Sequence, residues 1–215
     1  KLAMADTWFR EGGGAGLANA EAEYKDFILF YPTLEESAEA QMKESLAQQD
    51  MAQTNFDRAR GLREQGIVSA QAFDAARTGL DAARARVAAE ALRRAGVEAV
   101  YKKIDSTFRG NVGQELDAIL DVFPGPLTVL TPAFPPAGRA VRDGVLLVRG
   151  VPVHRTAIGR DPVTPLRESH LPTVLGRQSK RPVYPLCLAS LRGGSPSVAC
   201  ASSSFTTRIG IITAV

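Results

Sequence analysis

The segment AVYKKIDSTFRGNVGQELDAIL, residues 99–120, decides the fold class of this chain. Its first six residues are an apolar run that predicts a buried strand over residues 99–104. A polar loop, DSTFRGN, follows at residues 105–111. A helix is predicted next, because Asn111 is a good N-cap and Gln114 stands three residues later. Its apolar face consists of Leu116, Ile119, Leu120 and Phe123. A strand, a polar loop and a helix in this order indicate an α/β fold.

The loop at residues 105–111 carries side chains that suit an anionic ligand with hydroxyl groups. It follows a strand and precedes a helix N-terminus, the place where open α/β sheets bind ligands and where free amides favour an anion. Arg109 can hold a carboxylate or phosphate through two hydrogen bonds. Asp105 can accept hydrogen bonds from sugar hydroxyls or take a proton. The alternative is a plain turn with an Asp cap and a surface arginine, and spacing alone favours neither.

More strands and turns follow this unit. The run LTVLTP, residues 127–132, predicts a second strand, and the loop after it presents Arg139 as another candidate anion ligand. Turns at residues 143–144 and 149–150, both ending in glycine, predict a strand between them and a returning strand after the second turn. These elements extend the α/β pattern towards the C-terminus.

Residues 159–175, GRDPVTPLRESHLPTVL, predict a proline-rich loop followed by a short helix from about Pro165. Ion pairs within the loop are the ordinary explanation of its charged residues. Ligand binding is the alternative for Arg160, Asp161, Arg167 and Glu168.

Residues 35–95 contain no proline and are rich in Ala, Gln, Glu and Arg, which favour helix. Gly66 followed by Ser69 predicts a turn and the N-cap of a second helix. An apolar stripe at gaps of three and four residues marks one face of that helix. Its members are Phe73, Ala76, Leu80, Ala83, Val87 and Ala91. Two helices joined by a short turn predict an antiparallel helical hairpin.

Part of the hairpin, AQQDMAQTNFDRARGLREQGIVSAQAFDAARTGLDAARARVA, resembles the α-hairpin of periplasmic adaptor proteins of bacterial efflux pumps. In that family an Arg, a Leu and a Ser at the hairpin tip engage the outer-membrane channel, and Arg58, Leu62 and Ser69 have that spacing here. A helical interaction module is therefore the alternative function. The plainer explanation is that Ser69 is an N-cap, Leu62 packs and Arg58 is solvated. The half-lipoyl motifs and β-barrel of adaptors are not found in this sequence.

Three segments together resemble the N-terminal domain of the four-carbon acid sugar kinases. They are KKIDSTFRGNVGQELDAIL, PAFPPAGRAVRDGVLLVRGVPVHRT and GRDPVTPLRESHLPTVL, in the order of that family. The resemblance starts near Ala82 and covers about 110 residues. Several motifs in the right order are more specific than any one of them.

This resemblance implies ATP-dependent phosphorylation of a small acid sugar such as threonate or erythronate, with ATP and Mg as cofactors. It implies that Asp105 is catalytic, since an Asp orients or deprotonates the attacking hydroxyl. It also implies a set of substrate-binding residues. They are Lys103, Ser106, Arg109, Asn111 and Arg139.

The sequence departs from the kinase pattern in two ways. The Asp-Asp-x-Thr-Gly motif expected near the N-terminus is not found, and no phosphate-cradling Gly-rich loop stands in for the nucleotide-binding domain. Residues that bind the cofactor are therefore unknown, and we expect an incomplete, inactive fragment. The fold expected is α/β, a partial Rossmann-like three-layer domain at 81–194 preceded by the hairpin at 36–80. Residues 1–35 and 195–215 stay unassigned.

Composition narrows the classes of partner. The net charge is only +3 and no basic run is interleaved with aromatic residues, so nucleic-acid binding is not expected. Residues 61–215 are nevertheless basic, with 20 Lys and Arg against 12 Asp and Glu, which suits a small anion. Two cysteines and two histidines are too few for a zinc site.

No apolar run approaches the roughly 20 residues of a membrane-spanning helix. We expect a cytoplasmic protein that makes no membrane contact. Self-association through the hairpin is the remaining partner prediction. The end of the chain, IGIITAV, is apolar and uncharged, so it should be paired in a sheet.

Overall fold

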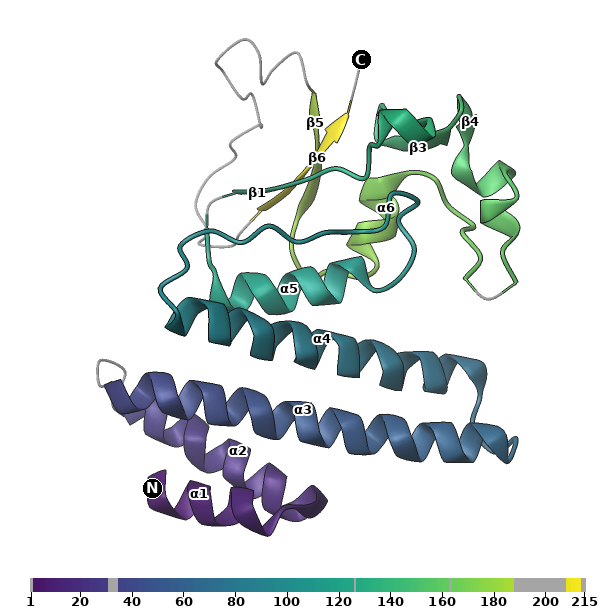
Figure 1. The fold of residues 1–215 in the computed structure, drawn as a ribbon. Helices are drawn as coiled ribbons and strands as arrows, with labels where there is room; N and C mark the ends of the chain where they lie inside the picture. Colours follow the sequence, from purple (N-terminus) through teal and green to yellow (C-terminus); the bar gives the residue numbers. More distant parts are fainter. Residues whose placement is uncertain (1, 31–34, 126, 163, 188–207, 214–215) are drawn as a thin grey trace. The chain divides into compact units, whose positions relative to one another are not determined.

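The computed structural model describes residues 2–30, 35–125, 127–162, 164–187 and 208–213 (Figure 1). Contacts between residues divide the chain into two compact units. The helical unit is Lys1–Val100 together with Asp121–Phe123, and the α/β unit is Tyr101–Leu120 together with Pro124–Val215. Each unit has its own core, so each is described by itself.

The helical unit begins with α1 (Leu2–Glu11) and α2 (Gly13–Phe30), in a region whose sequence shows no clear period. Small residues hide the pattern there, because buried alanines and glycines do not stand out as apolar. Gly12 takes a φ of +66°, which turns the chain between the two helices at little cost. A Cβ at Gly16 would lie 3.0 Å from the carbonyl oxygen of Trp8, so the helices approach closely at that point.

The predicted helical hairpin is present as α3 (Glu35–Glu64) and α4 (Ala70–Arg94). Gly66 turns the chain with a φ of +73°, and Ser69 caps α4 by accepting a hydrogen bond of 3.2 Å from the amide of Ala72. The rings of Phe56 and Phe73 lie 5.5 Å apart between the two helices. The apolar stripe continues beyond residue 80 because α4 is one unbroken helix.

The side chains that suggested an efflux adaptor lie towards the turn of this hairpin. Arg58 and Ser69 are exposed and Leu62 is half-buried. Ser69 makes the capping bond described above. The adaptor function stays a prediction. Within the described residues, no helix is both long and apolar enough to cross a membrane.

The α/β unit contains two small sheets. The first is parallel, with β6 (Arg208–Thr213) between β1 (Leu127–Leu130) and β5 (Val183–Cys187). Residues 209–213 of the apolar end are thus paired in a sheet, as their composition requires. The second sheet is antiparallel, in the order β2, β3 and β4. The fold class is α/β, as predicted.

The second sheet confirms both predicted turns. Strand β2 (Arg139–Arg142) pairs with β3 (Val145–Val148), and β3 pairs with β4 (Val151–Pro152). The turn residues Asp143 and Gly144 have φ values of 50° and 77°, and Arg149 and Gly150 have 50° and 80°. Two successive positive φ values match the right-handed twist of the flanking strands.

Helices α5 (Val112–Val122) and α6 (Leu171–Gly176) supply much of the core of this unit. Leu116 and Leu120 on the predicted apolar face of α5 are both buried. They join one hydrophobic cluster with residues from the loops and the second sheet. Its other buried members are Phe108, Val112, Leu130, Val141, Leu146, Val153, Leu171 and Leu175.

Two predictions of local structure are wrong. Residues 99–104 form no strand, and Tyr101 is 91% exposed. This segment spans the boundary between the units and pairs with no strand of the two described sheets, so its backbone gains no ladder hydrogen bonds. The helix expected from about Pro165 begins only at Leu171. A Glu168 side-chain oxygen accepts hydrogen bonds from the two amides just before the helix, which holds that stretch as a turn.

Candidate functional site

The loop at residues 105–111 is shaped by a buried phenylalanine. Phe108 is 1% exposed and has a φ of +63°, a backbone conformation that non-glycine residues rarely adopt. Its amide donates a hydrogen bond of 2.9 Å to the carbonyl oxygen of Asp105, which closes a tight turn. Packing of the Phe108 ring in the core holds this strained turn in place. As a result, the side chains of Asp105 and Arg109 meet.

The carboxylate of Asp105 is the acceptor at the centre of the loop. One oxygen accepts hydrogen bonds from the Thr107 hydroxyl at 2.5 Å and from Arg109 Nε at 2.7 Å. Partial burial opposes ionisation of Asp105, but the hydrogen bonds from Arg109 and Thr107 outweigh it and lower its pKa to about 2. Asp105 is therefore a carboxylate at neutral pH and a weak proton acceptor.

Arg109 lies between two carboxylates. Its Nε is hydrogen-bonded to Asp105, as described above, and its Nη1 is 3.9 Å from Asp161 Oδ2. The other oxygen of Asp161 accepts a hydrogen bond of 2.9 Å from the amide of Thr164. The hydrogen bond with Asp105 raises the pKa of Arg109 above its already high value. Of the two sequence-based interpretations of Asp161, the ion pair within the loops is the one that the structure shows.

A cavity of about 330 Å³ adjoins this loop. That volume lies at the small end of the roughly 300–1,000 Å³ typical of small-molecule sites. The cavity is lined by the loop, by the segment before α6 and by the end of α6. Its lining residues are Phe108, Arg109, Gly110, Thr164, Pro165, Leu166, Arg167, Glu168, Val174, Arg177 and Gln178.

The one acidic residue of the lining, Glu168, is engaged with the backbone. Its Oε1 accepts hydrogen bonds of 2.8 Å from the amide of His170 and 2.7 Å from that of Ser169. These bonds lower the pKa of Glu168, so it is charged at neutral pH. Arg177 attracts the same carboxylate electrostatically without a salt bridge to it. The lining thus carries three arginines against one carboxylate.

Gln178 fastens the wall of the cavity to the start of α5. Its side-chain nitrogen donates a hydrogen bond of 3.2 Å to the carbonyl oxygen of Gly110, and its Oε1 accepts one of 3.0 Å from the amide of Gly113. A Cβ at Gly113 would lie 2.4 Å from the Gln178 Cβ, so only glycine allows this approach. The loop, the start of α5 and the residues after α6 are therefore held together beside the cavity.

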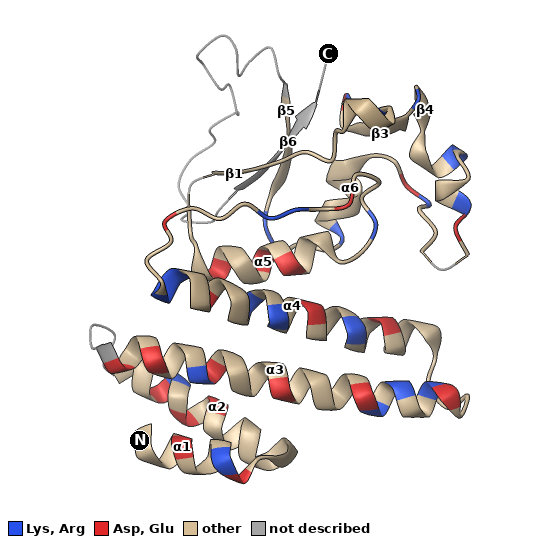
Figure 2. Ribbon diagram, viewed as in Figure 1, with Lys and Arg blue, Asp and Glu red and all other residues tan. Residues whose placement is uncertain are grey.

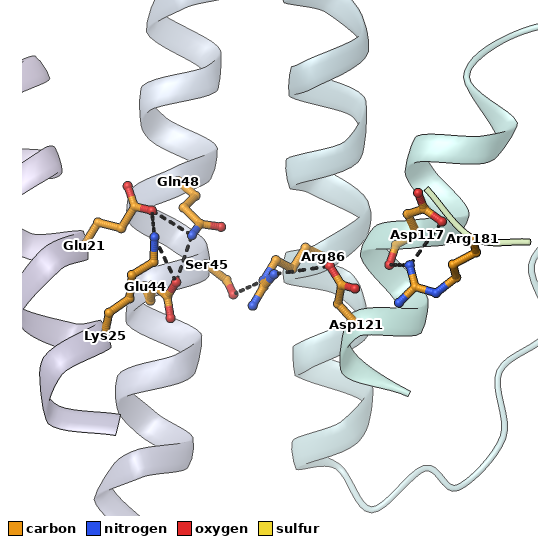
Figure 3. A network of polar contacts seen from close by, with 9 residues as sticks. All are labelled: Glu21, Lys25, Glu44, Ser45, Gln48, Arg86, Asp117, Asp121 and Arg181. Atoms are coloured by element: carbon orange, nitrogen blue, oxygen red, sulfur yellow. Dashed lines mark hydrogen bonds and ion pairs between the residues drawn. The ribbon is translucent and has the colours of Figure 1, made fainter. Parts of the chain in front are cut away.

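A buried ion pair fixes the chain just after Gln178. Asp117 of α5 accepts hydrogen bonds from the Ser179 hydroxyl at 2.7 Å and from the Lys180 amide at 2.8 Å. It also accepts one of 3.1 Å from Arg181 Nη1 (Figure 3). The side chains of Asp117 and Arg181 are only 12% and 15% exposed. Three donors satisfy the buried carboxylate, so residues 179–181 are fixed in position against α5.

The structure brings some predicted site residues together and leaves others apart. Asp105 and Arg109 meet, and Arg109 lines the cavity. Ser106 and Asn111 are half-buried in the same loop, and Lys103 is exposed. Arg139, in β2, donates to the carbonyl oxygen of Ala137, while its Nε is buried without a partner among the described residues. None of these four lines the cavity.

Sequence reasoning missed two residues of this site. Arg177 and Gln178 follow α6, far from the DSTFRGN loop in the sequence, and no local pattern marks them. Their contacts with residues 110–113 come from the tertiary fold. Arg167 and Glu168 were already candidates, and both line the cavity.

Charged residues of both signs occur along α3 and α4 (Figure 2). In the described part of the chain, no group of three or more His, Cys, Asp and Glu is placed to hold a metal ion. The arginine-lined cavity is therefore the candidate site for an anionic ligand.

Several curated proteins are similar to this chain. A D-threonate kinase of Bordetella bronchiseptica is 51% identical over 96 residues, which are 44% of this chain and 24% of that protein. A D-threonate kinase of Salmonella typhimurium is 44% identical over 98 residues, 46% of this chain and 23% of that protein. A D-erythronate kinase of Heliobacterium modesticaldum is 44% identical over 98 residues, 45% and 22% of the two chains. The chain spans about a quarter of the length of these relatives.

Solved structures share the fold. A Bordetella bronchiseptica protein described as a domain of unknown function, with bound citrate and as a domain-swapped dimer, has a TM-score of 0.50 and 37% identity. The match covers 63% of this chain and 32% of that one. A Haemophilus influenzae protein has a TM-score of 0.51 at 23% identity, over 60% of this chain and 38% of that one.

The family described as sugar-binding N-terminal domain matches residues 39–214. The match begins inside α3, so it includes most of the helical hairpin and the described strand β6 as well as residues 81–194. It covers well over half of the chain. The chain therefore belongs to the sugar-binding N-terminal domain family of the four-carbon acid sugar kinases.

Proposed function

We propose that this chain is the sugar-binding part of a kinase that phosphorylates a four-carbon acid sugar, of the threonate or erythronate type, with ATP. The observation that carries the proposal is the cavity lined by Arg109, Arg167 and Arg177 beside the carboxylate of Asp105. Cations suit the acid group of such a ligand, and a carboxylate suits its hydroxyls. The names of the curated relatives support the same class of substrate.

Asp105 is better suited to orienting a hydroxyl than to removing its proton. A general base works best when its pKa lies near the working pH, and that of Asp105 is about 2. Its carboxylate is nevertheless charged and fixed by Arg109 and Thr107, so it offers a rigid acceptor. Fixing the attacking hydroxyl in this way accelerates transfer by positioning.

The described residues do not fit a nucleotide with its Mg²⁺. No cluster of acidic side chains is placed for the metal in this part of the chain, and Asp105 and Asp161 are both engaged by other groups. A cavity of about 330 Å³ suits a small acid better than a nucleotide. We therefore assign sugar binding to this chain and phosphate transfer to the whole kinase.

Calorimetric titration of the purified chain with threonate and erythronate tests the proposal. We expect saturable binding of at least one of them, weakened roughly tenfold by Arg109→Ala, because that change frees Asp105 and removes a cation from the cavity. Erythritol, which has the hydroxyls without the acid, should bind much more weakly.

Arg142→Ala is the matched control, since Arg142 is exposed on β2 and does not line the cavity. Its affinity should equal that of the unaltered chain. Absence of binding to either acid sugar, in a chain shown to be folded by circular dichroism, would contradict the proposal.

Self-association is a second proposal. The similar Bordetella bronchiseptica protein is described as a domain-swapped dimer, which supports the proposal by similarity. Light scattering of the purified chain should give the mass of a dimer, and a monomer mass at all concentrations would contradict it.

A further inference from the structure

The three arginines of the cavity differ in what already neutralises them. Arg109 is hydrogen-bonded to Asp105 and lies 3.9 Å from Asp161, so two carboxylates share its charge. Within the described residues, Arg167 and Arg177 take part in no hydrogen bond or salt bridge through their side chains. The positive charge available to a ligand in the cavity is therefore that of these two lining residues.

The nearby acid does not cancel this charge. Oε1 of Glu168 is held by the amides of Ser169 and His170 in the turn before α6. Arg177 attracts Glu168 from a distance but forms no salt bridge with it. One engaged carboxylate thus stands against two guanidinium groups, so this part of the lining keeps a net positive charge.

We infer that Arg167 and Arg177 bind the carboxylate of the acid sugar, while Arg109 acts as a positioning residue for Asp105. This inference rests on the proposed function and adds the direction in which the ligand lies. A carboxylate gains most from a guanidinium that has no competing partner, because no existing ion pair must be broken. The hydroxyl groups of the ligand then lie towards Arg109 and the loop that carries Asp105.

This assignment reverses the roles that the sequence motif implies. The DSTFRGN motif draws attention to Arg109 as the anion ligand, yet its Nε is committed 2.7 Å from Asp105. Arg167 and Arg177 lie outside that motif, before and after α6. They determine specificity for an acid over a neutral sugar.

The test compares threonate with its neutral amide, threonamide, by calorimetry on the full chain. The double variant Arg167→Gln/Arg177→Gln should lose most of the preference for the acid, because each exposed arginine contributes up to roughly fivefold to that preference. Arg109→Gln should weaken both ligands and keep the preference. The control Arg142→Gln should change neither ligand's affinity.

Chemical protection gives a second measurement that does not depend on weak binding of the amide. Phenylglyoxal modifies arginines, and mass spectrometry locates the products. Threonate should protect Arg167 and Arg177, and Arg109 should react slowly with or without the ligand. Protection confined to Arg109, or an acid preference retained by the double variant and lost in Arg109→Gln, overturns the inference and leaves the proposed function intact. No binding of threonate or erythronate by the unaltered chain overturns both.

Discussion

The helical unit and the α/β unit bury different kinds of side chain. Most buried apolar residues of the helical unit are alanines, among them Ala5, Ala20, Ala40, Ala47 and Ala89. Those of the α/β unit are leucine, valine and phenylalanine, and its loops are tied by buried polar contacts. Burial of alanine removes little apolar area from water, so the helices depend more on local propensity. The α/β unit depends on contacts between residues distant in the sequence.

The largest effect should follow removal of the buried carboxylate in the α/β unit. Asp117→Ala leaves Arg181 and the Lys180 amide without this acceptor and should lower the free energy of unfolding of that unit by about 3 kcal/mol. Asp74→Ala in the helical unit removes an exposed partner of Arg77 and should cost less than about 1 kcal/mol. Urea unfolding monitored by hydrogen exchange measures the free energy of unfolding of each unit.

Trp8 is the chain's one tryptophan and lies in α1, so its fluorescence reports on the helical unit alone. Asp117→Ala should leave the fluorescence midpoint nearly unchanged. Equal losses from the two substitutions would contradict the contrast between the units.

Adding one methyl group should have opposite effects in the two units. Gly113→Ala brings a Cβ within 2.4 Å of Gln178 and should cost about 2 kcal/mol, because the fastened segment must move. Gly79→Ala in α4 meets nothing within 4 Å and should gain about 1 kcal/mol from helix propensity. Thermal unfolding of both variants measures the difference, and a stabilised Gly113→Ala chain would show that the Gln178 contact is not tight.

Acid should weaken the site loop through Asp105. Its pKa in the folded chain, about 2, is below the ordinary value of 3.8, so ionisation favours the folded state. This contribution is present above about pH 4 and is lost as the pH falls towards 2. Asp105→Asn should therefore be less stable than the unaltered chain at pH 6, with the gap closing below pH 4. A difference in stability between the two chains that stays constant from pH 6 to pH 2.5 in urea titrations would contradict the lowered pKa of Asp105.

Ser69→Ala should cost the helical unit about 1 kcal/mol, since the Ala72 amide loses its cap. Ser69→Asn is the matched control because asparagine also caps helices well. Trp8 fluorescence and exchange of the first amides of α4 would measure the change. Equal stabilities of the Ala and Asn variants would show that the cap contributes nothing.

The smallest effect belongs to Glu44, whose pKa shift is opposite in sign to that of Asp105. Burial raises the pKa of Glu44, although Arg86 and Lys25 work against it. Gln48 donates a hydrogen bond of 2.9 Å to its carboxyl group (Figure 3). The folded state therefore favours the protonated form, and this residue adds stability as the pH falls through its raised pKa. Glu44→Gln should be more stable than the unaltered chain at pH 7, by less than about 1 kcal/mol.

The gain from Glu44→Gln should vanish near pH 4, where glutamic acid is protonated in both states. Trp8 fluorescence in urea at pH 7 and pH 4 would measure it. A loss of stability at pH 7 would mean that the ion pair with Lys25 outweighs burial.

Local signals predicted much of the chain. The cap at Ser69, the turn at Gly66 and the two glycine turns of the second sheet depend on residues a few positions apart, so the sequence contains the whole cause. The same holds for the apolar face of α5. The segment at residues 99–104 fails for the opposite reason, since an apolar extended run becomes a strand only where another strand is free to pair with it.

By its sequence alone, this protein is an α/β chain with a helical hairpin, and it carries the motifs of the acid sugar kinases around Asp105 and Arg109. Only the tertiary structure decided that Arg109 is neutralised by Asp105 and Asp161, and that Arg167, Arg177 and Gln178 form the same cavity. The reason is physical: caps, turns and helix faces arise from neighbours in the sequence, whereas the charge left for a ligand depends on which distant side chains meet.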